Sequence, residues 1–144
     1  MCPELLCLFF GEARSVRAQA ALDEAVTYTQ NRIIRGKPIS TMQGIRWEMA
    51  DMYSKLQACR WYTYRTAALL DEDPKRFQVE AAACKNFVQP VVTQIILDSL
   101  RLHGGYGITK EFKIERLYRS QPGNIVISVS LEINKSIVGA SLVK

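Results

Sequence analysis

Apolar residues recur with helical spacing over most of the chain. Between Thr41 and about Asp71 they alternate in steps of three and four residues, which places them in one stripe along a helix. The stripe consists of Met42, Ile45, Met49, Met52, Leu56, Cys59 and Thr63. A helix over this segment would be about 45 Å long. A helix of that length with a narrow apolar stripe is best buried in an antiparallel bundle.

Capping signals set the boundaries of the two long helices. Ser40 and Gln43 have the spacing of a capping box, so we expect the first long helix to begin here. Asp73 followed by Pro74 predicts the N-cap and the first helical position of the second. That second helix is apolar over a wide arc, so we expect it to be central and to end at Gly104–Gly105.

The remaining segments predict shorter elements. Residues 18–32 are expected to form a helix with small and apolar residues facing inward. These inward residues are Ala21, Leu22, Ala25 and Tyr28. Thr109 is expected to cap a short helix over residues 111–119, and "SQPGN" at 120–124 predicts a turn. A final helix is expected from about Ser130. The elements together predict an all-α fold, an up-and-down four-helix bundle in a single domain over residues 1–144.

The charge pattern limits the classes of binding partner that we expect. The net charge is +5, from 19 basic and 14 acidic residues. The basic residues recur singly between apolar positions, so we expect no nucleic-acid partner. A field of this sign equally suits small molecules that carry phosphate. The apolar run Leu5–Phe10 is too short to span a membrane. We therefore expect no membrane span and a cytoplasmic protein, or one of the mitochondrial matrix if the source is a eukaryote.

The cysteines do not indicate a metal site. Cys2, Cys7, Cys59 and Cys84 have no CxxC spacing, and the chain has one histidine, so we expect no metal. Reduced thiols in a reducing compartment are the preferred interpretation. The histidine, His103, and the nearby Tyr106 are expected to be packing residues.

Three stretches, in order, resemble the C-terminal helical domain of the acyl-CoA dehydrogenases. They are "ALDEAVTYTQNRIIRGKPISTMQGIR" (21–46), "ADMYSKLQACR" (50–60) and "LHGGYGITKEFKIERLYR" (102–119). The resemblance implies a four-helix bundle that is the third domain of a flavoenzyme, with FAD as cofactor and an acyl-CoA as substrate. We expect the two preceding domains to be absent. It also implies a homodimer or homotetramer, and an electron-transfer partner is a further possibility.

Several positions match residues that contact FAD in this family. Arg32 matches an arginine that reaches the FAD phosphates of a neighbouring subunit; the alternative is a solvated arginine at a helix C-terminus. Gln43 matches a glutamine near the cofactor, or else completes the capping box. Gly104 and Gly105 match glycines that let the adenine half of FAD approach the backbone, although a helix C-cap explains one of them.

The sequence departs from the family where the chemistry is expected. Arg35 replaces an aromatic residue and Arg101 replaces a glutamine. There are two alternatives for Arg101. It binds a phosphate more strongly than a glutamine would, or the pocket no longer binds FAD as it does in the rest of the family. Ser128 stands at the position of the catalytic glutamate, and Val129 adds bulk where the family has glycine. Ser130 remains able to donate a hydrogen bond to FAD.

An unactivated serine hydroxyl is far too weak a base to remove an α-proton at neutral pH. Glu4 and Glu12 are the nearby carboxylates on the first helix, and neither is assigned as a replacement. Two hypotheses follow. The chain is the C-terminal domain of an FAD-dependent enzyme that oxidises acyl-CoA or reduces enoyl-CoA, or it is a non-catalytic oligomerisation or binding module derived from that family. A basic helical nucleic-acid binder has only the net charge in its favour. In either of the first two cases we expect the isolated chain to show no turnover.

Overall fold

The computed structural model describes residues 3–126 and 130–143, with side chains described from 13 to 124 and from 130 to 143. Its elements, in chain order, are α1 (Pro3–Asn31), β1 (Ile33–Ile34), β2 (Lys37–Pro38), η1 (Ile39–Thr41), α2 (Gln43–Glu72), α3 (Pro74–His103), η2 (Gly104–Ile108), α4 (Lys113–Arg119), α5 (Gln121–Val126) and α6 (Leu131–Leu142). No described helix is long and apolar enough to cross a membrane.

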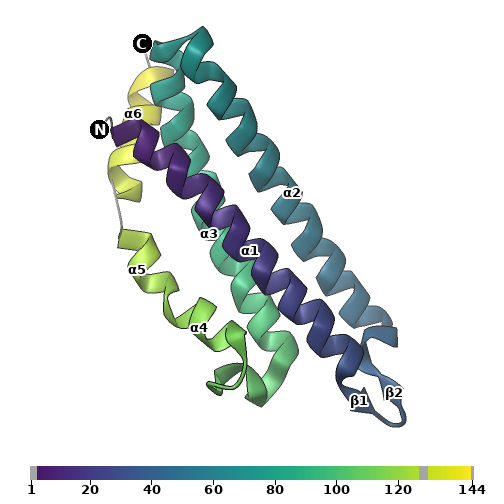
Figure 1. Cartoon of the computed structure of the whole chain (residues 1–144). Helices are drawn as coiled ribbons and strands as arrows, with labels where there is room; N and C mark the ends of the chain where they lie inside the picture. The colour runs from purple at the N-terminus through teal and green to yellow at the C-terminus, as the bar shows by residue number, and fades with distance from the viewer. Residues whose placement is uncertain (1–2, 127–129, 144) are drawn as a thin grey trace.

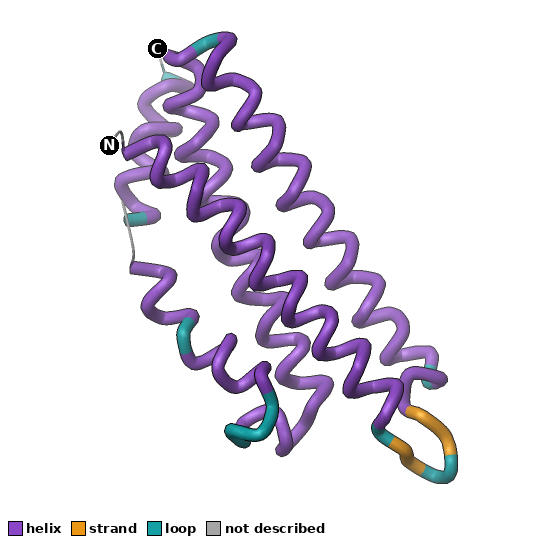
Figure 2. Tube along the Cα trace, viewed as in Figure 1, coloured by secondary structure: helices purple, strands orange, loops and turns teal. Residues whose placement is uncertain are grey.

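The helices form an up-and-down bundle (Figure 1). The long helices α1, α2 and α3 run side by side, and α3 packs against both of the others. The helices α4, α5 and α6 then return along the bundle as a fourth, interrupted arm, with α4 and α6 packed on α3 (Figure 2). The predicted all-α four-helix bundle is therefore confirmed, and its fourth helix is divided into three pieces.

The core lies where α1, α2 and α3 meet. Ala18, Ala21 and Ala25 are fully buried on α1, which lets the neighbouring helices approach closely. The predicted stripe on α2 is buried from Met52 onward, but Met42 is exposed because the start of α2 extends beyond the core. The inward direction predicted for α1 is confirmed at its alanines and Leu22, whereas Tyr28 is only half-buried.

Two predicted caps are confirmed. The side chain of Asp73 accepts a hydrogen bond from the backbone N–H of Arg76 at 3.1 Å, and Pro74 opens α3. The hydroxyl of Ser130 accepts a hydrogen bond from the backbone N–H of Ile133 at 3.3 Å and caps α6. These short-range signals were readable because cap and helix are contiguous in the sequence.

Two other cap predictions are wrong. Ser40 does not cap α2, because it lies within η1, and the N-cap of α2 is Met42, which makes no side-chain hydrogen bond there. The short 3-10 turn instead buries Ile39. Thr109 does not cap α4 either: its hydroxyl donates to the carbonyl of Tyr106 at 3.0 Å, and α4 begins at Lys113.

Three further boundaries differ from the sequence prediction. Helix α1 begins at Pro3 rather than near residue 18. The predicted turn at 120–124 is wrong, since α5 covers most of it; Pro122 lies in the first turn of α5, where its missing N–H costs nothing. An unpredicted β-hairpin joins α1 to the start of α2, with Ile33 paired to Pro38. Arg35 and Gly36 form its turn with φ of 52° and 78°, as a two-residue type I′ turn requires.

Candidate functional site

The three glycines after α3 are held by different constraints. Gly104 has φ +60°, a conformation that L side chains rarely adopt, so it is the C-cap glycine of α3. A Cβ on Gly107 would lie 2.7 Å from the carbonyl oxygen of Leu100, so packing excludes a side chain there. Gly105 has neither constraint: its φ lies outside the left-handed range, and an added Cβ would meet nothing within 4 Å. The fold does not require glycine at 105.

Arg101, one turn before these glycines, is held by a buried carboxylate. Its guanidinium lies 3.3 Å from Asp98, which is only 5% exposed. Asp98 also accepts a hydrogen bond from Gln94 at 2.8 Å and lies 3.7 Å from the ammonium of Lys55 on α2. The rest of the Arg101 side chain remains exposed to solvent. One carboxylate thus fixes the direction of Arg101.

Arg101 borders a cavity of about 530 Å³ between the end of α3 and the start of α2. Met42 and Gly44, the two neighbours of Gln43, line its other side. The structure therefore brings Arg101 and the Gln43 segment to one cavity, although Gln43 itself is exposed and does not line it. A cavity of several hundred Å³ is of the size that holds a small organic group.

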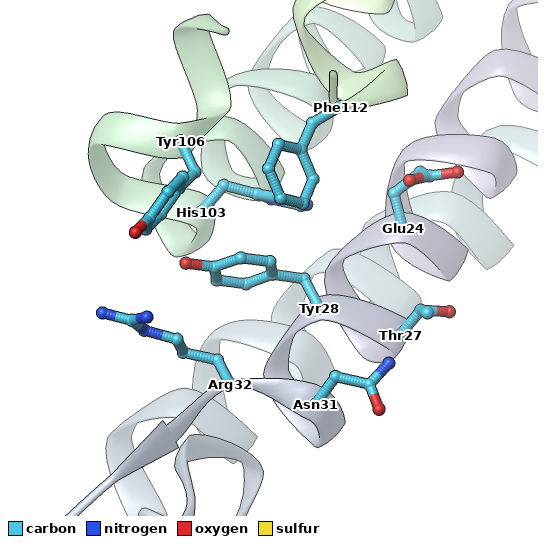
Figure 3. A pocket seen from close by; sticks show the side chains of 8 residues that line it. All are labelled: Glu24, Thr27, Tyr28, Asn31, Arg32, His103, Tyr106 and Phe112. Carbon is cyan, nitrogen blue, oxygen red and sulfur yellow. The ribbon is translucent and has the colours of Figure 1, made fainter.

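Arg32 follows the last residue of α1 and is exposed. Its guanidinium carbon lies 5.3 Å from the centroid of the Tyr106 ring, in a cation–π arrangement. Figure 3 shows Arg32 at the edge of a second cavity, of about 260 Å³, opposite Tyr106. The guanidinium is therefore directed toward the segment that follows α3, as a residue of a shared site requires.

His103 and Tyr106 differ in their surroundings. His103 is 1% exposed, and its Nδ1 lies 2.8 Å from the carbonyl oxygen of Ser99. Its ring stacks on Tyr28 with centroids 4.3 Å apart, so its predicted packing role is confirmed. Tyr106 contacts Phe112, Tyr28 and Arg32 but stays 48% exposed, so it belongs to the surface as well as to the packing.

Ser130 lies apart from the other predicted site residues. Its neighbour Leu131 lines a small cavity with Gln89 and Gln94 in the middle of α3. Gln94 precedes Gly104 by ten residues, about 15 Å along a helix. Ser128 and Val129, where the catalytic glutamate and a glycine were expected, lie outside the described residues, as do the side chains of Glu4 and Glu12.

Comparison with known proteins identifies the family. The sequence profile of the acyl-CoA dehydrogenase C-terminal domain matches residues 11–143. The chain belongs to the acyl-CoA dehydrogenase family. It is 37% identical over 127 residues to the 3-(aryl)acrylate reductase of Clostridium sporogenes, and 34% identical over 127 residues to the caffeyl-CoA reductase–Etf complex subunit CarC of Acetobacterium woodii. Each match covers 88% of this chain and 33% of the relative.

Comparison with solved structures supports the same family. The butyryl-CoA dehydrogenase of Megasphaera elsdenii superimposes with a TM-score of 0.92 and 27% identity, over 99% of this chain and 37% of that one. The chain therefore spans about a third of the length of the relatives it matches. It corresponds to the C-terminal domain of these acyl-CoA dehydrogenase-family proteins.

The two cysteines of this acyl-CoA dehydrogenase-family domain whose side chains the structure describes are not suited to nucleophilic chemistry. Cys59 and Cys84 are buried and free. Burial raises the pKa of the Cys59 thiol to about 12, and the pKa of the Cys84 thiol is also raised by burial. Both are therefore thiols at neutral pH, as expected for reduced core cysteines. Cys2 lies outside the described residues, as does the side chain of Cys7.

Some residues of the site were not found from the sequence. Asp98 and Phe112 are not predicted as site residues, because each resembles an ordinary helix or loop residue, and Tyr28 is predicted from the sequence only as an inward-facing packing residue. Asp98 lies three residues before Arg101, on the same helix face, and that spacing was the available signal. Tyr28 and Phe112 are 84 positions apart, and nothing local in the sequence indicates that their rings meet.

Proposed function

We propose that this chain is the C-terminal, cofactor-contacting domain of an FAD-dependent oxidoreductase that acts on acyl-CoA or enoyl-CoA thioesters. The acyl-CoA dehydrogenases are flavoproteins, generally with FAD. The observation that carries the proposal is Gly105 beside Arg101: it is exposed and the fold does not require glycine there. Gly44, Gly123 and Gly139 are equally unconstrained, so what distinguishes Gly105 is its place in the segment that resembles the cofactor-contacting glycines of the family. A bare backbone beside an exposed arginine is what a bound dinucleotide needs for close approach.

We divide the FAD contacts between the two arginines. Arg32 is exposed at the end of α1 and forms no ion pair with any described residue, so its guanidinium is available to phosphate oxygens. Arg101 borders the larger cavity, and Gly104 and Gly105 follow it by one turn of the chain without lining that cavity; these three would face the adenine half. Gln43 stands beside the same cavity. Ser130 lies far along the bundle and would contact a different part of the cofactor.

FAD, when bound, supplies the hydride acceptor for α,β-oxidation or the hydride donor for the reverse reduction. This chain contributes binding and orientation. If Ser128 stands at the position of the base, the proton must be exchanged by another group, because a serine hydroxyl is too weak a base. Relatives named reductases and relatives named dehydrogenases match this chain at similar identity, 37% for the 3-(aryl)acrylate reductase and 38% for the short-chain specific acyl-CoA dehydrogenase of Bos taurus, so the proposal includes both directions. We expect the 144-residue chain alone to show no turnover.

We also propose that the domain assembles into a homodimer or homotetramer. Outside its buried stripe, α2 carries large aromatic side chains that are more than half exposed: Trp47, Tyr53, Trp61 and Tyr64. A row of exposed aromatic residues of this size is typical of an interaction surface. The CarC relative is named as a subunit of a complex with Etf, so an electron-transferring flavoprotein is a candidate partner of the complete enzyme.

The alternative function is a non-catalytic assembly module. The pairing of Arg101 with buried Asp98 favours it, because the carboxylate already engages the guanidinium where the family has a neutral amide. The two proposals differ in one property: whether FAD binds at Gly104 and Gly105, the segment after α3 that we call the glycine turn.

Amide chemical shifts of the chain during a titration with FAD test this directly. The chain is 16.3 kDa, small enough for such spectra, and weak binding is sufficient for detection. The enzyme-domain proposal expects the largest shifts at Arg32, Arg101, Gly104 and Gly105, and their loss in Arg32→Ala. A control variant, Arg76→Ala at the far end of the bundle, should titrate as the wild type does. Absence of shifts at the glycine turn would favour the assembly module.

A further inference from the structure

Helix α2 has a second regular face that the bundle does not bury. Its buried stripe packs on α3 and α1 (Figure 1). Ser54 lies two positions from Met52 and two from Leu56, about 200° around the helix from each, so it points away from that stripe. Four more exposed residues share the direction of Ser54, at helical steps of three and four. The five residues, which we call the outer stripe, are Trp47, Ala50, Ser54, Ala58 and Trp61.

The outer stripe is symmetric about Ser54. Ala50 and Ala58 each lie four positions from it, and Trp47 and Trp61 each lie seven positions from it. Small side chains therefore occupy the centre, and a large ring stands at each end. The hydroxyl of Ser54 donates to the carbonyl oxygen of Ala50 at 2.9 Å, so burying it leaves no donor unsatisfied. A pattern that is the same in both directions suits an interface between two antiparallel copies of one helix.

The charges at the two ends of α2 favour the antiparallel direction. The segment 32–46, at the start of α2, carries four cations and no acidic residue. The other end is acidic, with Asp71, Glu72 and Asp73 in succession. Lys75 follows these, and Arg76 is paired with Glu80 at 3.7 Å, so the turn keeps an acidic excess. Parallel copies would bring like charges together at both ends, whereas antiparallel copies bring each basic end to an acidic one.

We propose that two copies of this chain pair through the outer stripe, with their α2 helices antiparallel and a two-fold axis beside Ser54. The inference rests on the assembly proposed above and specifies its face, direction and register. In such a pair the numbers of two facing positions add up to 108, twice 54. Trp47 then lies beside Trp61 of the partner subunit, and Ala50 faces Ala58 of the partner subunit.

The packing of this pair follows from the sizes of its side chains. Ala50, Ser54 and Ala58 allow the two helices to approach to the lower end of the 8–10 Å range found between packed helices. At that separation the tryptophans at the ends reach the partner helix. Trp47 is 63% exposed and Trp61 is 72% exposed in the single chain, and pairing removes much of this apolar surface from water. Buried tryptophans are frequent anchors of stable interfaces.

Cysteine cross-linking tests the direction and the register. Cys2→Ser and Cys7→Ser together give a background in which the remaining cysteines, Cys59 and Cys84, are buried. Single cysteines are then introduced along the outer stripe of the 144-residue chain. Each variant is oxidised with copper phenanthroline and examined on a non-reducing gel. Ser54→Cys should form a cross-linked dimer by itself, because position 54 faces its own copy across the axis.

The two alanines give the discriminating result. Ala50→Cys should not cross-link by itself, because the two copies of position 50 are separated by eight residues, about 12 Å along the helices. A disulfide spans at most about 7 Å between Cα atoms. Ala58→Cys should fail for the same reason. An equilibrated mixture of Ala50→Cys and Ala58→Cys should cross-link, because these two positions face each other.

Tyr118→Cys, on the exposed surface of α4, is the control for random collision and should stay uncross-linked under the same oxidation. Parallel pairing in register would cross-link all three single variants of the outer stripe. Pairing through another surface, or occupation of α2 by a different protein, would cross-link none of them. Each of these two results would overturn the inference.

A charge at the axis provides a second measurement. Ser54→Glu brings two carboxylates together at the two-fold axis, so it should raise the dissociation constant of the dimer at least about tenfold in sedimentation equilibrium. Ser136→Glu on α6 is the matched control, because Ser136 is also exposed and its hydroxyl also donates to the carbonyl oxygen four residues earlier. A Ser54→Glu variant that dimerises like the wild type would overturn the inference.

Failure here is distinguishable from failure of the proposed function. Neither measurement includes FAD, so the outcome of the FAD titration does not affect them. A dimer that fails to cross-link at the outer stripe refutes this face and register, while the assembly proposal stands. A wild-type chain that is monomeric refutes both.

Discussion

Replacing Gly105 and Gly107 separately by alanine distinguishes a ligand-contacting glycine from a packing glycine. At Gly105 the backbone suits any residue and the added methyl group meets nothing within 4 Å. Alanine there restricts the unfolded chain, so Gly105→Ala should raise the free energy of unfolding by about 0.4–1 kcal/mol. At Gly107 the same methyl group would lie 2.7 Å from a backbone oxygen and 3.1 Å from the Leu100 side chain. Gly107→Ala should therefore cost about 1–3 kcal/mol.

Thermal unfolding followed by circular dichroism measures both changes. For a chain of this size 1 kcal/mol corresponds to about 2–4 °C, so Gly105→Ala should melt slightly higher and Gly107→Ala several degrees lower. In the FAD titration, by contrast, Gly105→Ala should lose more affinity than Gly107→Ala. Gly105→Ala places a methyl group where we propose that the cofactor approaches, so it should weaken binding at least about tenfold, as expected for a clash or lost contact of about 1.4 kcal/mol. A Gly105→Ala variant that binds FAD like the wild type, or that is destabilised, would refute the assignment.

Two further predictions concern the core and the surface of α2. Folding raises the pKa of Cys59 from 9.0 to about 12, so its contribution to stability is complete below pH 9 and is lost as the pH rises toward 12. Urea denaturation at pH 8 and pH 10.5 should show a larger loss of stability for the wild type than for Cys59→Ala; equal losses would contradict the assignment of the shift to this thiol. On the surface, gel filtration should show a dimer or tetramer that Trp61→Ser with Tyr64→Ser dissociates, while Tyr118→Ser on α4 has no effect. A monomeric wild type would remove the support for assembly through α2.

Contiguous signals in the sequence predicted the fold well. Asp73–Pro74 and Ser130 mark helix starts that depend on atoms within three residues, and the structure has both. The stripe on α2 predicted its buried face because helical periodicity is a property of one segment. The failures at Ser40 and 120–124 have the opposite origin. There, burial of Ile39 and the packing of the interrupted fourth arm determine the local backbone, and neither is visible in a window of a few residues.

The candidate site was predictable only through its family resemblance and one spacing. The glycines and Arg101 share a segment, so their proximity is local. The smaller cavity, beside Arg32, depends on the approach of Tyr28 to His103 and Phe112, which lie more than 70 positions further along the chain. No periodicity encodes such a contact. The partner of Arg101 was missed for a different reason: an aspartate at i−3 is common on solvated helix faces, and only its burial reveals that it fixes the arginine.

The burial of Asp98 affects which ligand groups Arg101 can bind. Arg101 and Lys55 share the carboxylate of Asp98, and Glu48 lines the same cavity as Arg101 and Asp98. Two cations and two carboxylates leave this region without a net charge. The replacement of a neutral amide by arginine therefore does not by itself create an anion site here. Arg101 is better placed to hydrogen-bond the uncharged adenine half of a dinucleotide. In the proposed site, attraction of the phosphates would then fall to Arg32: the carboxylate that lines the same cavity as Arg32, Glu24, is paired with Lys113, and Arg32 forms no ion pair with a described residue. It follows that FAD affinity should depend on salt through Arg32 rather than through Arg101.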